Sequence, residues 1–269
     1  MNFGIDISEW QKNINLEKAK NEGVTFAILR GGLTGYGTGR TYKKDKCFEE
    51  FYTKCKELSI PIGVYWYSCA ITYNLGRAEA SFLYENCLKG KTFEYPIYID
   101  VEDTHWQAKA SNEAVTEAIK GFCEFLEDKG YYVGIYASLY WFRKYINTDD
   151  LKRYDKWVAS WGNKRPKEPI GGLWQFGGST NVIRTNKVAG LICDQDYSYK
   201  DYPKIIKSNG LNGFGKDSET RKEMKYIVKR GDNLSRIAQI YNTTWQKIAE
   251  DNKIANPNLI LPGQELIIK

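Results

Sequence analysis

The sequence predicts an α/β fold: an irregular TIM-like (β/α) barrel of eight strands with few helices in its second half, followed by a small α+β domain of βααβ order. Two observations support this prediction. Short runs rich in β-forming residues recur over residues 1–200, and helix-like segments separate the first five of them. Such alternation favours parallel strands joined by right-handed crossovers, and eight strands are enough to close a barrel.

Eight segments are expected to form the barrel strands: 3–7, 26–32, 61–68, 95–102, 131–138, 156–161, 172–176 and 191–197. Helices are expected over 16–22, 46–58, 75–88 and 112–129. The last of these begins after Ser111, a good N-cap with a glutamate in the first turn, and ends before Gly130. The final gaps between strands are too short for full helices, so the second half of the barrel should lack them.

The composition changes after residue 203. Residues 204–224 are rich in Gly, Ser, Asn and charge, which is typical of a linker. Periodicity returns in residues 225–269, with strands expected at 226–229 and 265–268 and short helices at 233–241 and 244–251. We therefore expect a barrel domain over 1–203, a linker over 204–224 and a small domain over 225–269.

Composition argues against several classes of protein. No apolar run approaches the roughly 20 residues of a bilayer span, and the first residues lack the basic and apolar segments of a secretory signal. We therefore expect no membrane insertion and synthesis in the cytoplasm. The six cysteines include no C-x-x-C pair and are expected to be reduced core thiols. His105 is the only histidine, so a multi-histidine zinc site is excluded and no metal or cofactor is expected.

Charge is concentrated in the tail. Residues 203–269 hold twelve Lys/Arg against seven Asp/Glu, so they carry +5 of the net charge of +6. An anionic surface partner for this tail is one interpretation, and solvated lysines are the other. No nucleic-acid partner is expected, and the oligomeric state is left open.

The segment YPIYIDVED at residues 95–103 is the most informative stretch of the chain. Side chains of a strand alternate between its two faces, so Asp100 and Glu102 would share one face while Val101 points to the other. Two carboxyls at the end of an apolar strand are costly unless they are paired, hydrogen-bonded or used. This pattern predicts acid/base chemistry.

Polar and aromatic residues collect at the carboxyl ends of the expected strands, where barrels carry their active sites. For any one of them a structural role is the more frequent outcome, but convergence on one rim favours a site. These residues are Asp6, Trp66, Tyr67, Asp100, Glu102, Tyr136, Trp161, Gln175 and Asp194.

Four segments occur in order at 4–11 (GIDISEWQ), 98–102 (YIDVE), 173–176 (LWQF) and 192–194 (ICD). Together they resemble the glycoside hydrolase family 25 lysozymes, muramidases that cut peptidoglycan. The resemblance implies that Glu102 is the catalytic acid and that Asp6, Asp100 and Asp194 are the other carboxyls of the site. Asp196 competes with Asp194, because it lies two residues on along the same strand face. Substrate contacts are expected from Trp66, Tyr67, Tyr136, Trp161, Gln175 and Asp196.

Residues 226–238 (YIVKRGDNLSRIA) and 254–266 (IANPNLILPGQEL) resemble the LysM module, a unit that binds peptidoglycan and chitin. The resemblance implies a glycan groove between two loops, formed by Gly231, Asp232, Asn233, Leu234, Pro257, Asn258, Leu259 and Ile260. A purely structural interpretation stands beside it, since Gly231 suits a turn and Leu234 suits the core of a small domain.

The two resemblances imply a peptidoglycan hydrolase that cleaves the β-1,4 bond between N-acetylmuramic acid and N-acetylglucosamine. Glu102 would donate the proton, and Asp100 would orient the substrate's acetamido group or participate directly, with retention. An endolysin held in the cytoplasm until the host membrane is breached would fit the expected lack of a signal. The alternatives are an autolysin of the same chemistry, a chitinase, and a non-catalytic protein that binds peptidoglycan or chitin.

Overall fold

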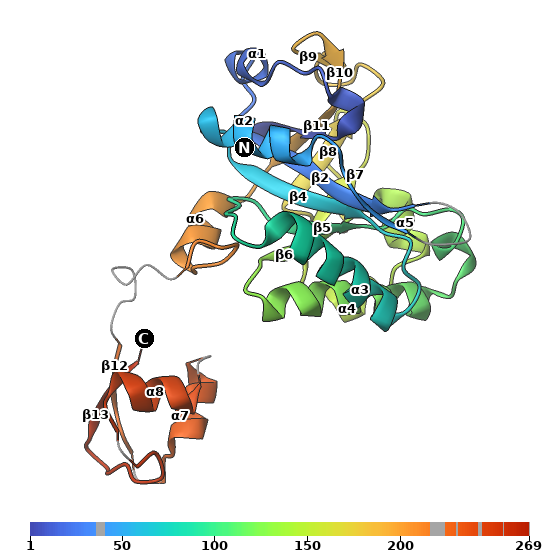
Figure 1. Cartoon of the computed structure of the whole chain (residues 1–269). Helices are drawn as coiled ribbons and strands as arrows, with labels where there is room; N and C mark the ends of the chain where they lie inside the picture. Colours follow the sequence, from blue (N-terminus) through green and yellow to red (C-terminus); the bar gives the residue numbers. More distant parts are fainter. Residues whose placement is uncertain (36–40, 216–223, 230, 242–243, 255, 269) are drawn as a thin grey trace. The chain divides into compact units, whose positions relative to one another are not determined.

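The chain forms two compact units, Met1–Gly215 and Lys216–Lys269, in the computed structural model shown in Figure 1. The structure describes residues 1–35, 41–215, 224–229, 231–241, 244–254 and 256–268. The first unit contains an eight-stranded barrel and the second is a small α+β domain, so the predicted fold class is confirmed. The first unit ends at residue 215, beyond the boundary expected at residue 203.

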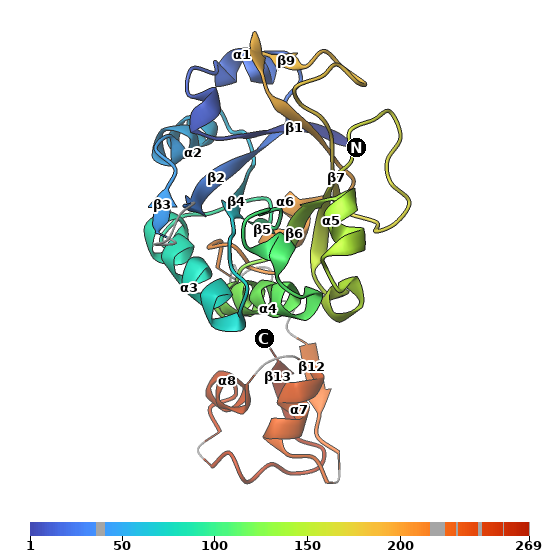
Figure 2. The same cartoon turned by 90° about the vertical axis from the view of Figure 1, so that its right-hand side faces the viewer.

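Eight strands close the barrel. They are β1 (Asn2–Ile7), β2 (Phe26–Thr34), β4 (Ile62–Tyr67), β5 (Ile97–Asp100), β6 (Val133–Ser138), β7 (Asp155–Ala159), β8 (Leu173–Gly177) and β11 (Asp194–Ser198). Their order around the barrel is β1, β11, β8, β7, β6, β5, β4 and β2, and the pairing of β2 with β1 completes the ring seen in Figure 2. A further strand, β3 (Tyr42–Lys44), extends the sheet beside β2.

The last barrel strand corrects the expectation of eight parallel strands. β11 pairs antiparallel with both β1 and β8. The predicted strand over 191–197 is also split, because β10 (Leu191–Ile192) pairs with β9 (Lys187–Val188) in a hairpin before β11 begins. A parallel strand needs a crossover to the opposite end of the sheet, whereas a strand reached by a loop at the same end returns antiparallel. Asp194 therefore enters the rim from the start of its strand.

Helices follow the first strands and become few after β6, as predicted. They are α1 (Leu16–Asn21), α2 (Phe48–Glu57), α3 (Tyr73–Leu83) continued by the π turn η2 (Tyr84–Leu88), α4 (Asn112–Asp128), α5 (Leu139–Lys144) and the short 3-10 segments η1 (Glu9–Gln11), η3 (Gln107–Lys109) and η4 (Thr148–Leu151). α3 and α4 cross closely at two glycines. A Cβ on Gly76 or Gly121 would lie 2.0 Å from a backbone oxygen of the opposite helix.

Residues 204–215 close one end of the barrel and are not part of a linker. α6 (Tyr202–Ser208) places Tyr202 and Ile206 in a buried cluster with strand residues that include Tyr98 and Leu173. Seen along the barrel in Figure 2, this helix overlaps the opening of the ring of strands, and Figure 1 shows it at one end of the barrel. The Gly- and Asn-rich composition that suggested a linker instead supplies turns, as at Asn212, whose φ is 53°. Residues 216–223 of the predicted linker lie outside the described residues, and its last residue, Met224, belongs to the strand Met224–Ile227.

Asn212 ties this closing segment to the barrel. Its side chain accepts a hydrogen bond from the Tyr132 N–H at 2.7 Å and donates one to the Tyr95 carbonyl at 2.8 Å. We predict that Asn212→Ala lowers the free energy of unfolding by about 2–4 kcal/mol, because two buried backbone groups lose their partner. Asn209→Ala should change it by less than about 0.5 kcal/mol, because Asn209 is exposed and bonds a carbonyl of its own helix. Urea unfolding of the two variants measures the difference, and equal losses would contradict the role of Asn212.

The second unit has the predicted βααβ order. β12 (Met224–Ile227) pairs antiparallel with β13 (Glu265–Ile268), and α7 (Leu234–Ile240) and α8 (Trp245–Asp251) lie between them in the chain. Its small core consists of Val228, Leu234, Ile237, Ala238, Ile248, Ala249, Leu266 and Ile268. The unit thus has a hydrophobic core of its own.

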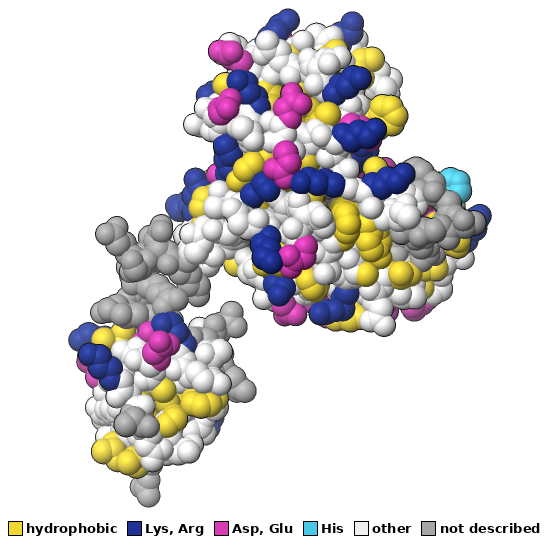
Figure 3. Space-filling model, in the orientation of Figure 1, with side chains coloured by type: hydrophobic (Ala, Val, Ile, Leu, Met, Phe, Trp, Pro, Cys, Tyr) yellow, Lys and Arg dark blue, Asp and Glu magenta, His cyan; other side chains and the backbone are white. Residues whose placement is uncertain are grey.

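The surface is mixed in charge. On the face drawn in Figure 3, Lys and Arg side chains are interspersed with Asp and Glu, and hydrophobic side chains gather over α3. Arg77 of this helix lies over the rings of Tyr73 and Phe125, 5.9 and 5.3 Å from their centroids. Within the described ranges no helix has the length and apolar character to cross a membrane. The six cysteines all lie among the described residues and form no disulfide, and five of them are buried.

Candidate active site

Four carboxyls singled out in the sequence, those of Asp6, Asp100, Glu102 and Asp194, meet at one end of the barrel. Asp6 and Asp194 are register partners on the adjacent strands β1 and β11. Asp100 ends β5 and is the register partner of Tyr136 on β6. All four charges act on the Tyr136 hydroxyl, whose pKa is raised by burial first and then by Glu102, Asp100, Asp6 and Asp194. Strands from both sides of the ring therefore supply one cluster around this tyrosine.

Glu102 lies two residues beyond the end of β5 and not on the strand itself, which corrects the predicted strand limit. The chain keeps its course for one more residue, since Val101 N–H donates to the Tyr136 carbonyl at 2.9 Å. It then turns at Asp103, whose buried carboxylate accepts hydrogen bonds from two N–H groups of the following turn. As a result Glu102 is partly exposed, while Asp100 is buried.

Burial raises the pKa of every carboxyl in the cluster, and repulsion by a neighbouring carboxyl adds to the rise for Asp6, Asp100 and Glu102. Burial raises the pKa of Asp194 to about 6, and burial together with the Asp194 charge raises the pKa of Glu102. The pKa of Asp100 is raised well above its ordinary value by burial and by Glu102, and that of Asp6 by burial, Asp194 and Asp196. Carboxyls in such surroundings hold a proton at higher pH and can donate it. In the described part of the chain no set of three or more His, Cys, Asp or Glu is arranged to hold a metal ion.

Asp6 forms hydrogen bonds with two buried polar residues below the rim, Gln175 and Asp196. Gln175 Nε2 donates to Asp6 Oδ2 at 2.9 Å, and Asp196 shares a hydrogen bond with Asp6 while accepting one from Trp157 Nε1 at 2.7 Å. Asp196 is 0% exposed, so the prediction that it contacts substrate is wrong. Asp196 lies two residues further along β11 than Asp194, on the same strand face but deeper in the barrel. Asp194 is the one of the two that reaches the rim.

Tyr65, not Trp66, faces the carboxyls from β4. Trp66 is fully buried on the other face of the sheet against Tyr42 and Phe82, so its predicted contact with substrate is wrong. Side chains of a strand alternate, and Trp66 therefore cannot share a face with Tyr67. Tyr65 can, and its pKa is raised by burial and by the charges of three of the four carboxyls. Tyr67 lies at the carboxyl end of β4 and is partly buried.

Trp161 borders the cluster and keeps a free face. Its Nε1 donates to Gln175 Oε1 at 3.1 Å, and the same oxygen accepts from the Tyr136 hydroxyl. Its side chain is 46% exposed. Gly178 allows this close approach, because a Cβ there would lie 1.9 Å from Asp194 Oδ1 and 2.7 Å from the Trp161 ring. An exposed indole beside a carboxyl cluster offers a flat surface on which a sugar ring can stack.

Two further residues of the site escaped the sequence reasoning. Arg30 lies in β2, where its Nε donates to Asp45 at 2.7 Å and its Nη2 donates to Glu9 at 2.9 Å. Its positive charge opposes the rise in the pKa of Asp100 and so favours the ionised form of that carboxyl. The sequence did hold a signal for this residue, because an arginine is unusual inside an apolar strand. Trp106, in the turn after Glu102, is 37% exposed and adds a second indole near the rim.

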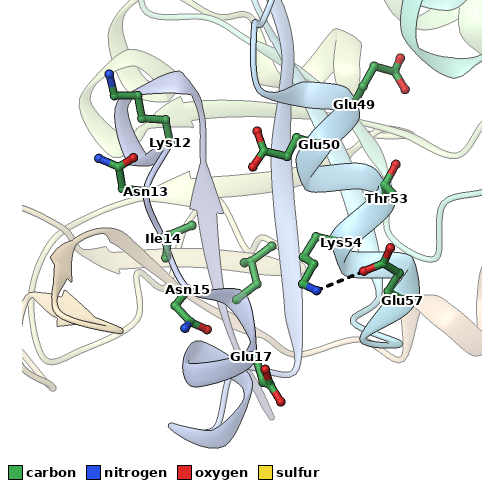
Figure 4. Close-up of a pocket in the computed structure, with 11 residues that line it drawn as sticks. Lys12, Asn13, Ile14, Asn15, Glu17, Glu49, Glu50, Thr53, Lys54 and Glu57 are labelled. Atoms are coloured by element: carbon green, nitrogen blue, oxygen red, sulfur yellow. Dashed lines mark hydrogen bonds and ion pairs between the residues drawn. The ribbon is translucent and has the colours of Figure 1, made fainter.

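A separate groove of about 830 Å³ lies between α2 and the segment that precedes α1, as Figure 4 shows. None of the predicted site residues lines it. Its carboxylates, Glu17, Glu49, Glu50 and Glu57, are exposed, and Figure 4 shows Lys54 reaching Glu57 along the helix. The groove is a solvated part of the surface, apart from the carboxyl cluster.

The second unit has a groove of about 620 Å³ lined by Asn233, Leu234, Ser235, Trp245, Pro257 and Asn258. Four of the eight predicted glycan-binding residues are among these six. The other four, Gly231, Asp232, Leu259 and Ile260, do not line it. Asp232 holds the turn by accepting from the Tyr226 hydroxyl and the Lys229 N–H, and Ile260 packs against the core. Trp245 was missed because it begins a helix outside the two loops considered, and it is 39% exposed.

A cluster of carboxyls with raised pKa values, bordered by exposed indoles at one end of a barrel, is the architecture of a glycosidase site. The chain belongs to the glycosyl hydrolases family 25, whose sequence model matches residues 5–184. The LysM domain model matches residues 226–269. Both resemblances inferred from the sequence are therefore confirmed.

Known proteins share the fold of the first unit. The CTP1L endolysin has a TM-score of 0.63 at 23% identity, over 77% of this chain and 70% of that one. The bacterial lysozyme from Streptomyces coelicolor has a TM-score of 0.62 at 22% identity, over 80% and 97%. The cortical fragment-lytic enzyme of Bacillus subtilis (strain 168) is 49% identical over 43 residues, which is 16% of this chain and 10% of that relative. The chain thus spans a small part of this curated relative.

Proposed function

We propose that the protein hydrolyses the β-1,4 bond between N-acetylmuramic acid and N-acetylglucosamine in peptidoglycan. The observation that carries the proposal is the partly exposed carboxyl of Glu102, whose pKa is raised by burial and by Asp194. Membership of glycosyl hydrolase family 25 and the presence of a LysM domain support peptidoglycan as the substrate.

In the proposed reaction Glu102 gives its proton to the glycosidic oxygen as the bond to the anomeric carbon breaks. The acetamido oxygen of the same sugar attacks that carbon, and Asp100 orients the acetamido group. Water then opens the cyclic intermediate and returns a proton to Glu102. Arg30 favours this division, because its positive charge opposes the rise that burial causes in the pKa of Asp100. Two inversions give net retention, so early-time NMR should detect the β-anomer of the new reducing end; the α-anomer would exclude this route.

A comparison of purified peptidoglycan with chitin tests the substrate. We expect the release of new reducing ends from peptidoglycan to be at least about tenfold faster than from chitin. Both polymers contain N-acetylated sugars, but only the N-acetylmuramic acid of peptidoglycan carries a lactyl group. Equal or higher release from chitin would favour a chitinase. Binding without release from either polymer would favour the non-catalytic alternative.

The groove of the LysM domain is proposed to hold the enzyme on the wall through stacking on Trp245. We predict that Trp245→Ala weakens binding of the full chain to purified cell walls by about tenfold, because one sugar stacking surface is lost. Leu261→Ala is a matched control, since Leu261 is 62% exposed and does not line the groove. Pull-down isotherms measure both variants, and equal weakening would rule out a specific role for Trp245.

We further propose that the protein acts at the bacterial cell wall as an endolysin, reaching it from the cytoplasm after the membrane is breached. The likeness in fold to the CTP1L endolysin supports this role. Expression inside a bacterium should leave the culture dense until the membrane is permeabilised, and lysis should then follow. Lysis without permeabilisation would favour the autolysin alternative.

A further inference from the structure

Glu79 is a buried carboxyl that the proposed chemistry does not use. It lies on α3 and is 1% exposed. Its Oε1 accepts hydrogen bonds from Thr34 Oγ1 at 2.5 Å and from Cys69 N–H at 3.1 Å, and its Oε2 accepts one from Ser68 Oγ at 2.5 Å. These donors satisfy both oxygens of one buried carboxyl. Since burying a carboxyl is costly, this arrangement calls for a role.

Ser68 connects Glu79 to the strand that carries Asp100. Its N–H donates to the Asp100 carbonyl at 3.0 Å, directly beside the end of β5. Its hydroxyl, while donating to Glu79, accepts from Gln107 Nε2 at 3.4 Å. Glu79 therefore sets the direction of the Ser68 hydroxyl and leaves its lone pairs for Gln107 Nε2 and for the Ala70 N–H, which donates to it at 3.1 Å.

Gln107 carries the connection to the chain just after Glu102. Its Oε1 accepts from Asp103 N–H at 3.1 Å, and its Nε2 also donates to the Ala70 carbonyl at 3.2 Å. Ser68 thus bonds the chain two residues before Glu102, and Gln107 bonds it one residue after. Ser68, Asp103 and Gln107 are each 1% exposed or less.

We propose that Glu79 is a positioning residue for Glu102, acting through Ser68 and Gln107 on the backbone at either side of it. The proposal rests on the proposed role of Glu102 as proton donor. A donor carboxyl must be held close to its productive position, and a displacement of about 1 Å can cost about 100-fold in rate. A hydrogen-bonded series of buried side chains behind the reacting group supplies that constraint.

Glu79→Gln in the full chain tests the proposal. The glutamine side chain has one oxygen that accepts hydrogen bonds and one NH2 group that only donates. It therefore cannot accept from both the Thr34 and the Ser68 hydroxyls, and the Ser68 hydroxyl must reorient. We expect kcat on soluble peptidoglycan fragments to fall by about 10- to 100-fold while KM changes less than about twofold. The alkaline limb of the pH profile should also move to lower pH, because Glu102 leaves the surroundings that raise its pKa. Wild-type kcat and an unmoved alkaline limb would overturn the proposal.

A second variant, Gln107→Met, tests the proposal if Glu79→Gln does not fold. It interrupts the hydrogen bonds from Glu79 through Ser68 to Gln107 at their other end and leaves no buried charge. It should lower kcat and shift the limb in the same way. In the double variant the losses should not multiply, because both changes interrupt one series; multiplied losses would overturn the connection. Glu85→Gln, an exposed glutamate paired with Lys89, is the matched control and should behave as wild type.

The outcome is separable from that of the proposed function. If Glu102 is not the proton donor, Glu102→Gln retains activity whatever Glu79→Gln does, and the positioning role fails with it. If Glu102→Gln is inactive but Glu79→Gln and Gln107→Met keep wild-type kcat and pH profile, the positioning proposal fails alone.

Discussion

Glu102→Gln should abolish hydrolysis of peptidoglycan, with a loss in kcat of at least about 100-fold and up to about 10,000-fold. A positioned general acid contributes a factor of this size, and glutamine cannot donate a proton to the leaving oxygen. Reducing-end release from purified peptidoglycan measures the loss. Binding to intact walls should be unchanged, because the LysM groove is built from a separate unit.

Two controls separate lost chemistry from lost structure. Glu117→Gln removes an exposed glutamate of α4 that pairs with Lys120, and it should keep wild-type activity. The free energy of unfolding of Glu102→Gln should not fall at neutral pH, since the folded state already disfavours the charge of Glu102. Activity within about threefold of wild type in the folded variant would remove Glu102 from the role of acid.

Asp194→Asn should stabilise the protein at neutral pH while impairing its activity. The pKa of Asp194 is about 6 in the folded protein against an ordinary value of 3.8. Because the folded pKa is raised, the folded state binds the proton more tightly. Its contribution to stability is therefore fully present below pH 4 and is lost as the pH rises through 6. Asparagine carries no such dependence.

The difference in free energy of unfolding between Asp194→Asn and wild type should grow from pH 4 to pH 7, reaching at most about 3 kcal/mol. Urea unfolding at several pH values measures it. Asp149→Asn, at an exposed carboxyl paired with Lys152, should follow the wild-type curve. A constant difference between Asp194→Asn and wild type across this range would contradict the burial of a charged Asp194.

The same substitution should shift the pH dependence of kcat/KM. The Asp194 charge raises the pKa of Glu102, so its removal lowers that pKa. The protonated acid is then lost at lower pH, and the alkaline limb moves to the acid side. An alkaline limb that stays in place would mean that Asp194 does not act on the proton donor.

Patterns of period two and the order of motifs predicted most of the barrel. The apolar runs located every barrel strand, and the acidic run located Asp100 and Glu102 at its rim. The direction of β11 could not be predicted, because a 16-residue connection is compatible with either a crossover or a hairpin until its pairing is known. Residues 204–215 were misjudged, because Gly and Asn serve turns as well as linkers.

The site could not be predicted where it depends on how deeply a side chain is buried, or on hydrogen-bond partners that are distant in the sequence. Trp66 and Asp196 have the right residue type for a substrate contact. Trp66, however, lies on the wrong face of its strand, and Asp196 lies too deep in the barrel. Strand alternation alone could have replaced Trp66 by Tyr65. Glu79 and Gln107 gave no signal, because the hydrogen bonds that connect them to Ser68 span 11 and 39 residues of chain. Only the folded chain brings such groups together.

The identity of the new reducing end tests the central claim most directly. Purified peptidoglycan would be digested by the full chain and by Glu102→Gln, reduced with borohydride and analysed by mass spectrometry. We predict N-acetylmuramitol at the cut ends with the wild-type chain and none above background with Glu102→Gln. N-acetylglucosaminitol, or cleavage confined to the stem peptides, would contradict the claim that this barrel is a muramidase with Glu102 as its acid.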